Sequence, residues 1–85
     1  MSNLKLLVMM NNQMFLTQIE EVASELGSPD CKLTEPFLIN DNDSLVPWLM
    51  DVTNENVFMI HSDKILTITE PNSKLKEKYL KLVKN

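Results

Sequence analysis

Arginine is absent from these 85 residues, and cysteine, glycine and tryptophan each occur once. Without arginine, the chain lacks the side chain best suited to bidentate contacts with phosphate or guanine. The lone cysteine, Cys31, excludes an intrachain disulfide, and no Cys/His cluster has the spacing of a zinc site. We therefore expect no metal and no cofactor, and this use of cysteine favours a reducing, cytoplasmic compartment.

Long apolar runs are also missing. The run from Leu4 to Met10 ends at Asn11, Asn12 and Gln13, well short of the ~20 apolar residues that span a bilayer. No small-residue cleavage site follows it. We expect neither a signal peptide nor a membrane partner.

The net charge of −4 is unevenly distributed along the chain. Residues 1–72 hold three lysines and eleven acidic residues, whereas residues 73–85 hold five lysines and a single acid, Glu77. An acidic body repels phosphate, so broad electrostatic binding of nucleic acid is disfavoured unless the tail or a local patch supplies it. The lysines of the tail are typical of the solvent face of an amphipathic helix.

The first half of the chain predicts strands joined by turns. Residues 4–10 and 14–22 are apolar runs, and the asparagines between them tolerate positive φ, which favours a hairpin. A helix competes over residues 14–26, because Ile19, Val22 and Leu26 recur at helical spacing. The only glycine, Gly27, marks the next turn.

The second half predicts three further strands and a long loop. A strand over residues 31–40 contains Pro36, which implies an edge position or a bulge. Residues 41–52 form the longest irregular part. Residues 57–60 and 65–69 are strongly β-prone, and we expect them to pair as the clearest hairpin of the chain.

A helix is predicted to end the chain. Pro71 stops the last strand, and Asn72 or Ser73 can cap a helix. The helix is expected to bury one apolar stripe of residues at helical spacing, namely Leu75, Tyr79, Leu82 and Val83. The predicted fold is thus mostly β: a small closed barrel of five strands over residues 1–70 and a C-terminal helix over residues 71–85, both in one domain.

The pattern resembles the Sm-like (LSm) family of strongly bent five-stranded barrels, and in particular its small phage-type members. Residues 58–68 match the second motif of that family in length and apolar spacing, with His61-Ser62-Asp63 where Arg-Gly-Asp is usual. The first motif is looser, because Asn12 and Thr17 stand where glycines are usual. The resemblance covers roughly residues 4–69.

This resemblance implies a ring of identical chains that join edge to edge, with single-stranded RNA as the ligand. By the same resemblance, the turn that contacts RNA comprises His61, Ser62, Asp63 and Lys64. Trp48, Ile65 and Leu66 are the candidate subunit contacts, although Trp48 can equally be a core residue. The alternative is a structural or adaptor oligomer of phage origin with no nucleic-acid role, which the acidic body and the lack of arginine favour.

Catalysis is not expected. His61, Ser62 and Asp63 are the residue types of a hydrolase triad, but adjacent side chains point in different directions and cannot converge on one proton path. The sequence therefore predicts a binding or assembly protein and no enzyme.

Overall fold

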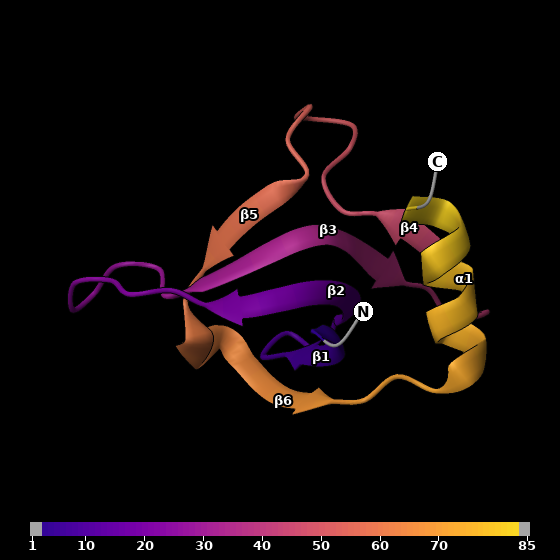
Figure 1. The fold of residues 1–85 in the computed structure, drawn as a ribbon, viewed down its shortest axis with the longest axis horizontal. Coiled ribbons are helices and arrows are strands. Elements are labelled where there is room, and N and C mark those ends of the chain that lie inside the picture. Colours follow the sequence, from indigo (N-terminus) through magenta and orange to yellow (C-terminus); the bar gives the residue numbers. More distant parts are fainter. Residues whose placement is uncertain (1–2, 84–85) are drawn as a thin grey trace.

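A computed structural model describes residues 3–83, which form one antiparallel sheet and one helix (Figure 1). The elements follow in the order β1 (Leu4–Met9), β2 (Met14–Glu21), β3 (Cys31–Ile39), β4 (Leu45–Pro47), β5 (Val57–Ile60), a 3-10 turn η1 (Ser62–Lys64), β6 (Ile65–Thr69) and α1 (Ser73–Val83). The prediction of a mostly β chain with a C-terminal helix is confirmed. The predicted domain ranges reach residues 1–2 and 84–85, which lie outside the described residues.

The strands lie in the order β4-β3-β2-β1-β6, and β5 also pairs with β3. β4 pairs with residues 37–39 of β3, and β5 pairs with residues 31–34 of the same strand. β4 and β5 therefore share one side of β3, while β6 pairs with β1 at the other end of the sheet.

The hairpin of β1 and β2 is confirmed, and with it the strand reading of residues 14–21. Leu7 pairs with Phe15 across the two strands. Asn12 has a φ of 69° in the connecting turn, a conformation that asparagine tolerates better than most residues. The local chemistry of the turn thus determined this part of the fold.

Pro36 lies at a bulge in the middle of β3, one of the two alternatives that the sequence left open. The pairing of β2 with β3 shifts register between Leu16 and Gln18, opposite this point. Glu35 adopts a φ of 52°, and Pro36 has no N–H to donate. The bulge divides β3 into the half that pairs with β5 and the half that pairs with β4.

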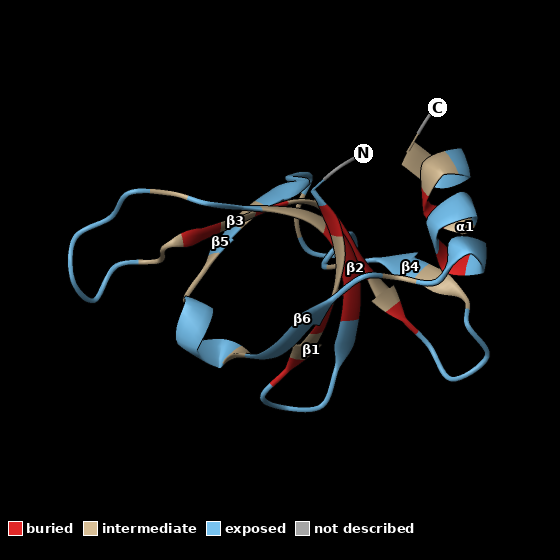
Figure 2. Ribbon diagram, turned by 60° about the horizontal axis from the view of Figure 1, so that its bottom comes forward, coloured by how far each residue is buried: buried red, intermediate tan, exposed pale blue. Residues whose placement is uncertain are grey.

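The predicted hairpin of residues 57–60 and 65–69 is wrong. The two segments are strands, but β5 pairs with β3 and β6 pairs with β1. The 3-10 turn between them redirects the chain from one end of the sheet to the other, so they diverge (Figure 2). The expected closed barrel of five strands is accordingly a curled, open sheet of six strands.

The sixth strand is β4, which lies within residues 41–52, where irregular structure was predicted. It has three residues and ends at Pro47, so its local sequence carries little strand signal. Its pairing with Phe37 to Ile39 is a tertiary contact, which local propensity does not reveal.

Both faces of the sheet are covered. One core cluster lies between the sheet and α1 and includes Leu4, Leu16, Leu75 and Tyr79. The second lies inside the curl of the sheet, where four residues are buried: Leu7, Met9, Phe15 and Leu33. Because both faces are buried, the central strands read as continuous apolar runs without strict alternation.

Helix α1 docks on the sheet through Leu75 and Tyr79, as predicted. The Asn72 side chain accepts the N–H of Leu75 at 2.8 Å and so caps the helix. Leu80 packs against the core cluster, whereas Leu82 is exposed. The prediction that Leu82 is buried is therefore wrong. The orientation of α1 on the sheet turns Leu80 toward the core and leaves Leu82 in solvent.

Within residues 3–83, no helix is long and apolar enough to cross a membrane.

Candidate functional site

The predicted contact turn lies at the corner where the chain leaves β5 for β6. Ser62, Asp63 and Lys64 form the 3-10 turn, and the Lys64 N–H donates to the His61 carbonyl at 3.1 Å. The Lys64 carbonyl accepts the N–H of Met10 at 2.9 Å. This bond fixes the corner to the β1–β2 turn.

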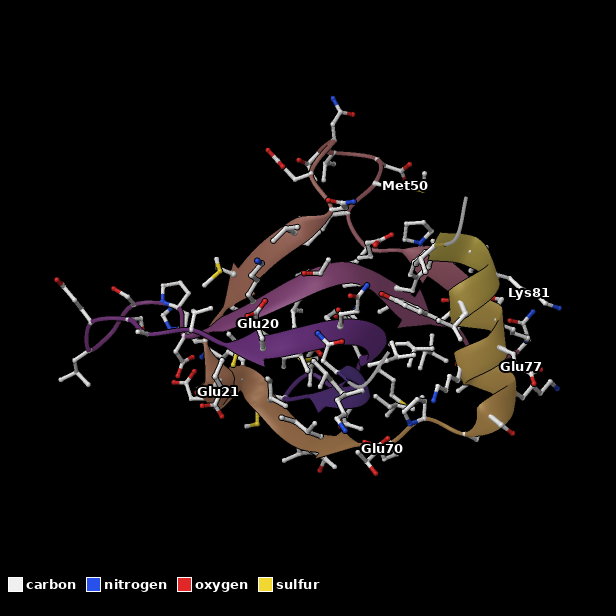
Figure 3. The ribbon with its side chains drawn as sticks, viewed as in Figure 1. Glu20, Glu21, Met50, Glu70, Glu77 and Lys81 are labelled. Carbon is white, nitrogen blue, oxygen red and sulfur yellow. The ribbon has the colours of Figure 1, made fainter. Side chains whose placement is uncertain are left out.

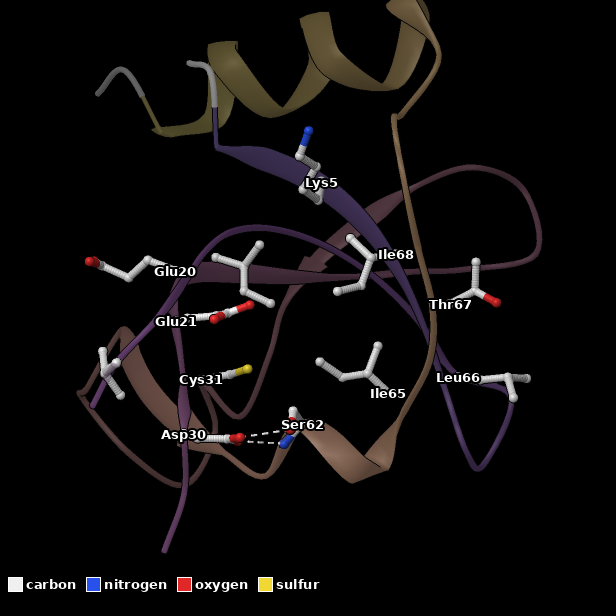
Figure 4. A pocket seen from close by; sticks show the side chains of 12 residues that line it. Lys5, Glu20, Glu21, Asp30, Cys31, Ser62, Ile65, Leu66, Thr67 and Ile68 are labelled. Atoms are coloured by element: carbon white, nitrogen blue, oxygen red, sulfur yellow. Dashed lines mark hydrogen bonds between the residues drawn. The ribbon is translucent and has the colours of Figure 1, made fainter. Parts of the chain in front are cut away.

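Asp30 holds the other side of this corner, a role that no local sequence pattern indicates. Its carboxylate accepts the backbone N–H and the hydroxyl of Ser62, each at 2.7 Å (Figure 4). These bonds favour the charged form and lower the pKa of Asp30 below its ordinary value of 3.8. The residues are 32 positions apart in sequence, so no local motif links them.

The turn does not bring His61 and Lys64 into the same hollow. His61, Ser62 and Asp63 line a shallow hollow with Asp30 and Gly27. Lys64 lines a different hollow beside Phe15 and Trp48. His61 therefore shares its hollow with the Asp30 and Asp63 carboxylates, which disfavour phosphate, and Lys64 shares its hollow with Phe15 and Trp48.

The triad reading has no support in the geometry. Among the described residues, the Ser62 hydroxyl donates to Asp30 and makes no hydrogen bond with the His61 ring. Cys31 is buried, and its pKa is raised, first by burial and then by the nearby Asp30 and Glu21 carboxylates. A raised pKa leaves the thiol protonated and unreactive at neutral pH.

The strands on either side of the corner, β5 and β6, each leave one edge unpaired within residues 3–83. Apolar side chains on both strands are exposed: Val57 by 40% and Met59 by 46% on β5, and Leu66 by 59% and Ile68 by 53% on β6. Neither strand contains a charged residue or a proline. β4, at the end of the sheet, also has an open edge within residues 3–83, but it is only three residues long and ends at Pro47.

A groove of about 680 Å³ runs along β6 and faces the end of β2 and the start of β3. In Figure 4, the side chains of Cys31, Ile65 and Ile68 point into the groove and Leu66 points away from it. Glu20 and Glu21 lie at the end of β2 beside it (Figure 3). The groove thus combines apolar side chains with the charged side chains of Glu20, Glu21 and Lys5.

The three candidate subunit contacts lie in different environments. Trp48 and Ile65 pack against the cluster inside the curl. The Trp48 ring is tilted against Phe15 and edge-on to Phe58, with ring centroids 4.8 and 5.2 Å away. Leu66 is exposed at the β6 edge. Trp48 is therefore half-buried at the margin of this cluster.

The described residues define the class of this molecule: a small, mostly β domain with a C-terminal helix, in which no three potential metal ligands gather. The family model described as "Family of unknown function (DUF6561)" matches residues 2–84, and the chain belongs to that family. No curated protein matches the sequence.

Proposed function

We propose that this protein is a non-catalytic, ring-forming module in which the β6 edge of one chain pairs with the β5 edge of the next. The observation that carries the proposal is that both strands have an unpaired, uncharged edge with exposed apolar side chains. Soluble proteins usually protect such edges with lysine, proline or a covering element, because an open edge is a template for another strand.

The position of Ile68 supports pairing at β6. Its side chain points into the groove, yet it stays 53% exposed, because no described strand lies beyond β6 to cover it. A β5 strand from a neighbouring chain would satisfy the open backbone groups of β6 and cover the groove with apolar side chains. Burial of that apolar surface favours association.

The contact joins two different edges, and this geometry favours a ring. A contact between unlike surfaces repeats from chain to chain until the rotation closes a ring, or else it continues as a filament. The resemblance to Sm-like proteins favours closure. A small domain buries only about 60% of its unfolded surface, so edge pairing also stabilises each chain.

Two blocked variants test the proposal. Leu66→Lys/Ile68→Lys places charge on the β6 edge, and Val57→Lys/Met59→Lys places it on the β5 edge. Each variant alone should be monomeric by light scattering, whereas an equimolar mixture should form a one-to-one dimer through the two intact edges. Val52→Lys/Leu82→Lys, which changes exposed apolar residues outside both strands, should assemble as the native chain does.

Other outcomes separate the alternatives. A β5-blocked variant that still dimerises alone would indicate pairing between two β6 edges and would contradict the ring. If both blocked variants assemble as the native chain does, the β5 and β6 edges are not the contact surfaces. Circular dichroism of each variant checks that the sheet is retained.

Binding of single-stranded RNA is a second candidate function, with a structural or adaptor ring of phage origin as its rival. The exposed turn with His61 and Lys64 favours RNA, whereas Asp30 and Asp63 beside His61 oppose it. Fluorescence anisotropy with U-rich and A-rich strands at low salt tests the point. Binding that weakens in His61→Ala and Lys64→Ala supports RNA, and no binding at low salt supports the adaptor ring.

A further inference from the structure

A hollow outside both strand edges has the composition of a small-molecule site. It has a volume of about 240 Å³ and lies between the β1–β2 turn, the segment after β4 and the 3-10 turn. We call it the Trp48 hollow; the residues used below are Met9, Gln13, Phe15, Trp48 and Lys64. None of the residues that line the hollow belongs to β5 or β6, so the hollow is distinct from both strand edges.

The walls of the hollow are fixed by backbone hydrogen bonds. The Met9 N–H donates to the Gln13 carbonyl at 2.8 Å, which closes the β1–β2 turn. The Met10 N–H reaches the Lys64 carbonyl at 2.9 Å, which fixes the turn to the opposite wall. The hollow therefore exists before any ligand arrives, which lowers the entropic cost of binding.

The floor is aromatic and held in place. Phe15 is buried, and Trp48 is wedged between Phe15 and Phe58 at centroid distances of 4.8 and 5.2 Å. The Trp48 ring is only half-buried despite these contacts. A fixed, partly exposed indole is a stacking surface for a planar ring.

The rim is cationic. The Lys64 side chain is exposed, and its ammonium makes no hydrogen bond or ion pair with any residue in 3–83, whereas Lys5 pairs with Glu70 and Lys32 with Glu20. No acidic residue lines the hollow. The Gln13 amide oxygen accepts the Asn11 side-chain N–H, which leaves the Gln13 amide nitrogen available to donate.

We propose that the Trp48 hollow binds a small aromatic anion, with its ring against Trp48 and its carboxylate or phosphate at Lys64. Charge complementarity selects an anion, because the Lys64 ammonium, which has no ionic partner among residues 3–83, lines a hollow that no acidic residue lines. Size selects one or two rings, because pockets for drug-sized ligands measure about 300–1,000 Å³.

The single tryptophan makes the test direct. The indole N–H of Trp48 gives one nitrogen–proton NMR signal, which is titrated with benzoate, phenyl phosphate, phenol and inorganic phosphate. Benzoate or phenyl phosphate should shift the signal saturably, and phenol and inorganic phosphate should bind several-fold more weakly. Tighter binding of benzoate than of phenyl phosphate would identify a carboxylate ligand, and the reverse order would identify a phosphate ligand.

Lys64→Gln should weaken the binding of the aromatic anion about fivefold and leave phenol unchanged, as expected for loss of one exposed ionic contact. Lys74→Gln, on helix α1, is the matched control and should bind as the native chain does. The proposal is overturned if no probe shifts the Trp48 signal saturably, or if Lys64→Gln binds the anions as tightly as the native chain. Dispersed backbone signals in each variant show that it is folded.

Discussion

Single side chains supply hydrogen bonds where the strand pairing is interrupted. At the bulge of β3, the buried Tyr79 hydroxyl lies 2.9 Å from the Glu35 carbonyl and accepts the Gln18 side-chain N–H at 3.2 Å. The Thr17 hydroxyl lies 3.2 Å from the Thr34 carbonyl in the same region. Side chains thus provide the hydrogen bonds that the interrupted ladder cannot, as buried carbonyls require.

Tyr79→Phe should lower the free energy of unfolding by about 1 kcal/mol, because it removes the hydroxyl that donates to the part-buried Glu35 carbonyl. Urea unfolding at neutral pH measures the change. Leu82→Ala on the exposed face of α1 is the control and should stay within about 0.5 kcal/mol of the native chain. Equal stability of Tyr79→Phe and the native chain would contradict this role for the hydroxyl.

Asp30 should make stability depend on pH in acid. Its folded-state pKa lies below the ordinary value of 3.8, so the charged form contributes stability above that pH and loses it as the pH falls through the folded-state pKa. Asp30→Asn should therefore have a lower urea midpoint than the native chain at neutral pH, and the difference should shrink below pH 3.8.

Asp51→Asn is the matched control for Asp30, because Asp51 is exposed and makes no hydrogen bond or ion pair with the described residues. It should unfold at the native urea midpoint throughout the pH range. A constant difference between Asp30→Asn and the native chain down to low pH would show that the carboxylate charge has no part in fixing the corner.

At the scale of elements, the sequence predicted best where local chemistry decides. Asn12 at positive φ makes the β1–β2 turn, and Asn72 caps α1. The pairing of β5 and β6 was mispredicted, because strand propensity does not say which strand pairs with which. β5 pairs with β3 and β6 with β1 because the 3-10 turn, held by the distant Asp30, directs the two strands apart. The same limit concealed β4 and the Trp48 hollow, whose walls come from three separate segments.

The cap of α1 gives an element-scale prediction. Asn72→Ala should lower the free energy of unfolding by about 1 kcal/mol, because the Leu75 N–H loses its acceptor. Asn72→Ser should recover most of that loss, since a serine hydroxyl also accepts at this position. Thermal unfolding measures both, and equal losses in the two variants would indicate that capping is not the cause.

At the scale of the whole molecule, the curled sheet divides the apolar residues between two small cores and leaves further apolar side chains on two open edges. The helix covers one face, the curl covers the other, and neither covers the outer edges of β5 and β6. The fold class was predictable from strand-prone segments and turn residues. The openness of the sheet was not, because it depends on which distant strands pair.

The mass of the native chain in solution, measured by light scattering over a wide range of protein concentration, tests edge-to-edge assembly most directly. We expect a mass that is a constant multiple of the chain mass and that persists on dilution, as a closed ring requires. A monomer at every concentration would contradict the proposed pairing of β6 with β5, and a mass that grows continuously with concentration would show that the contact does not close into a ring.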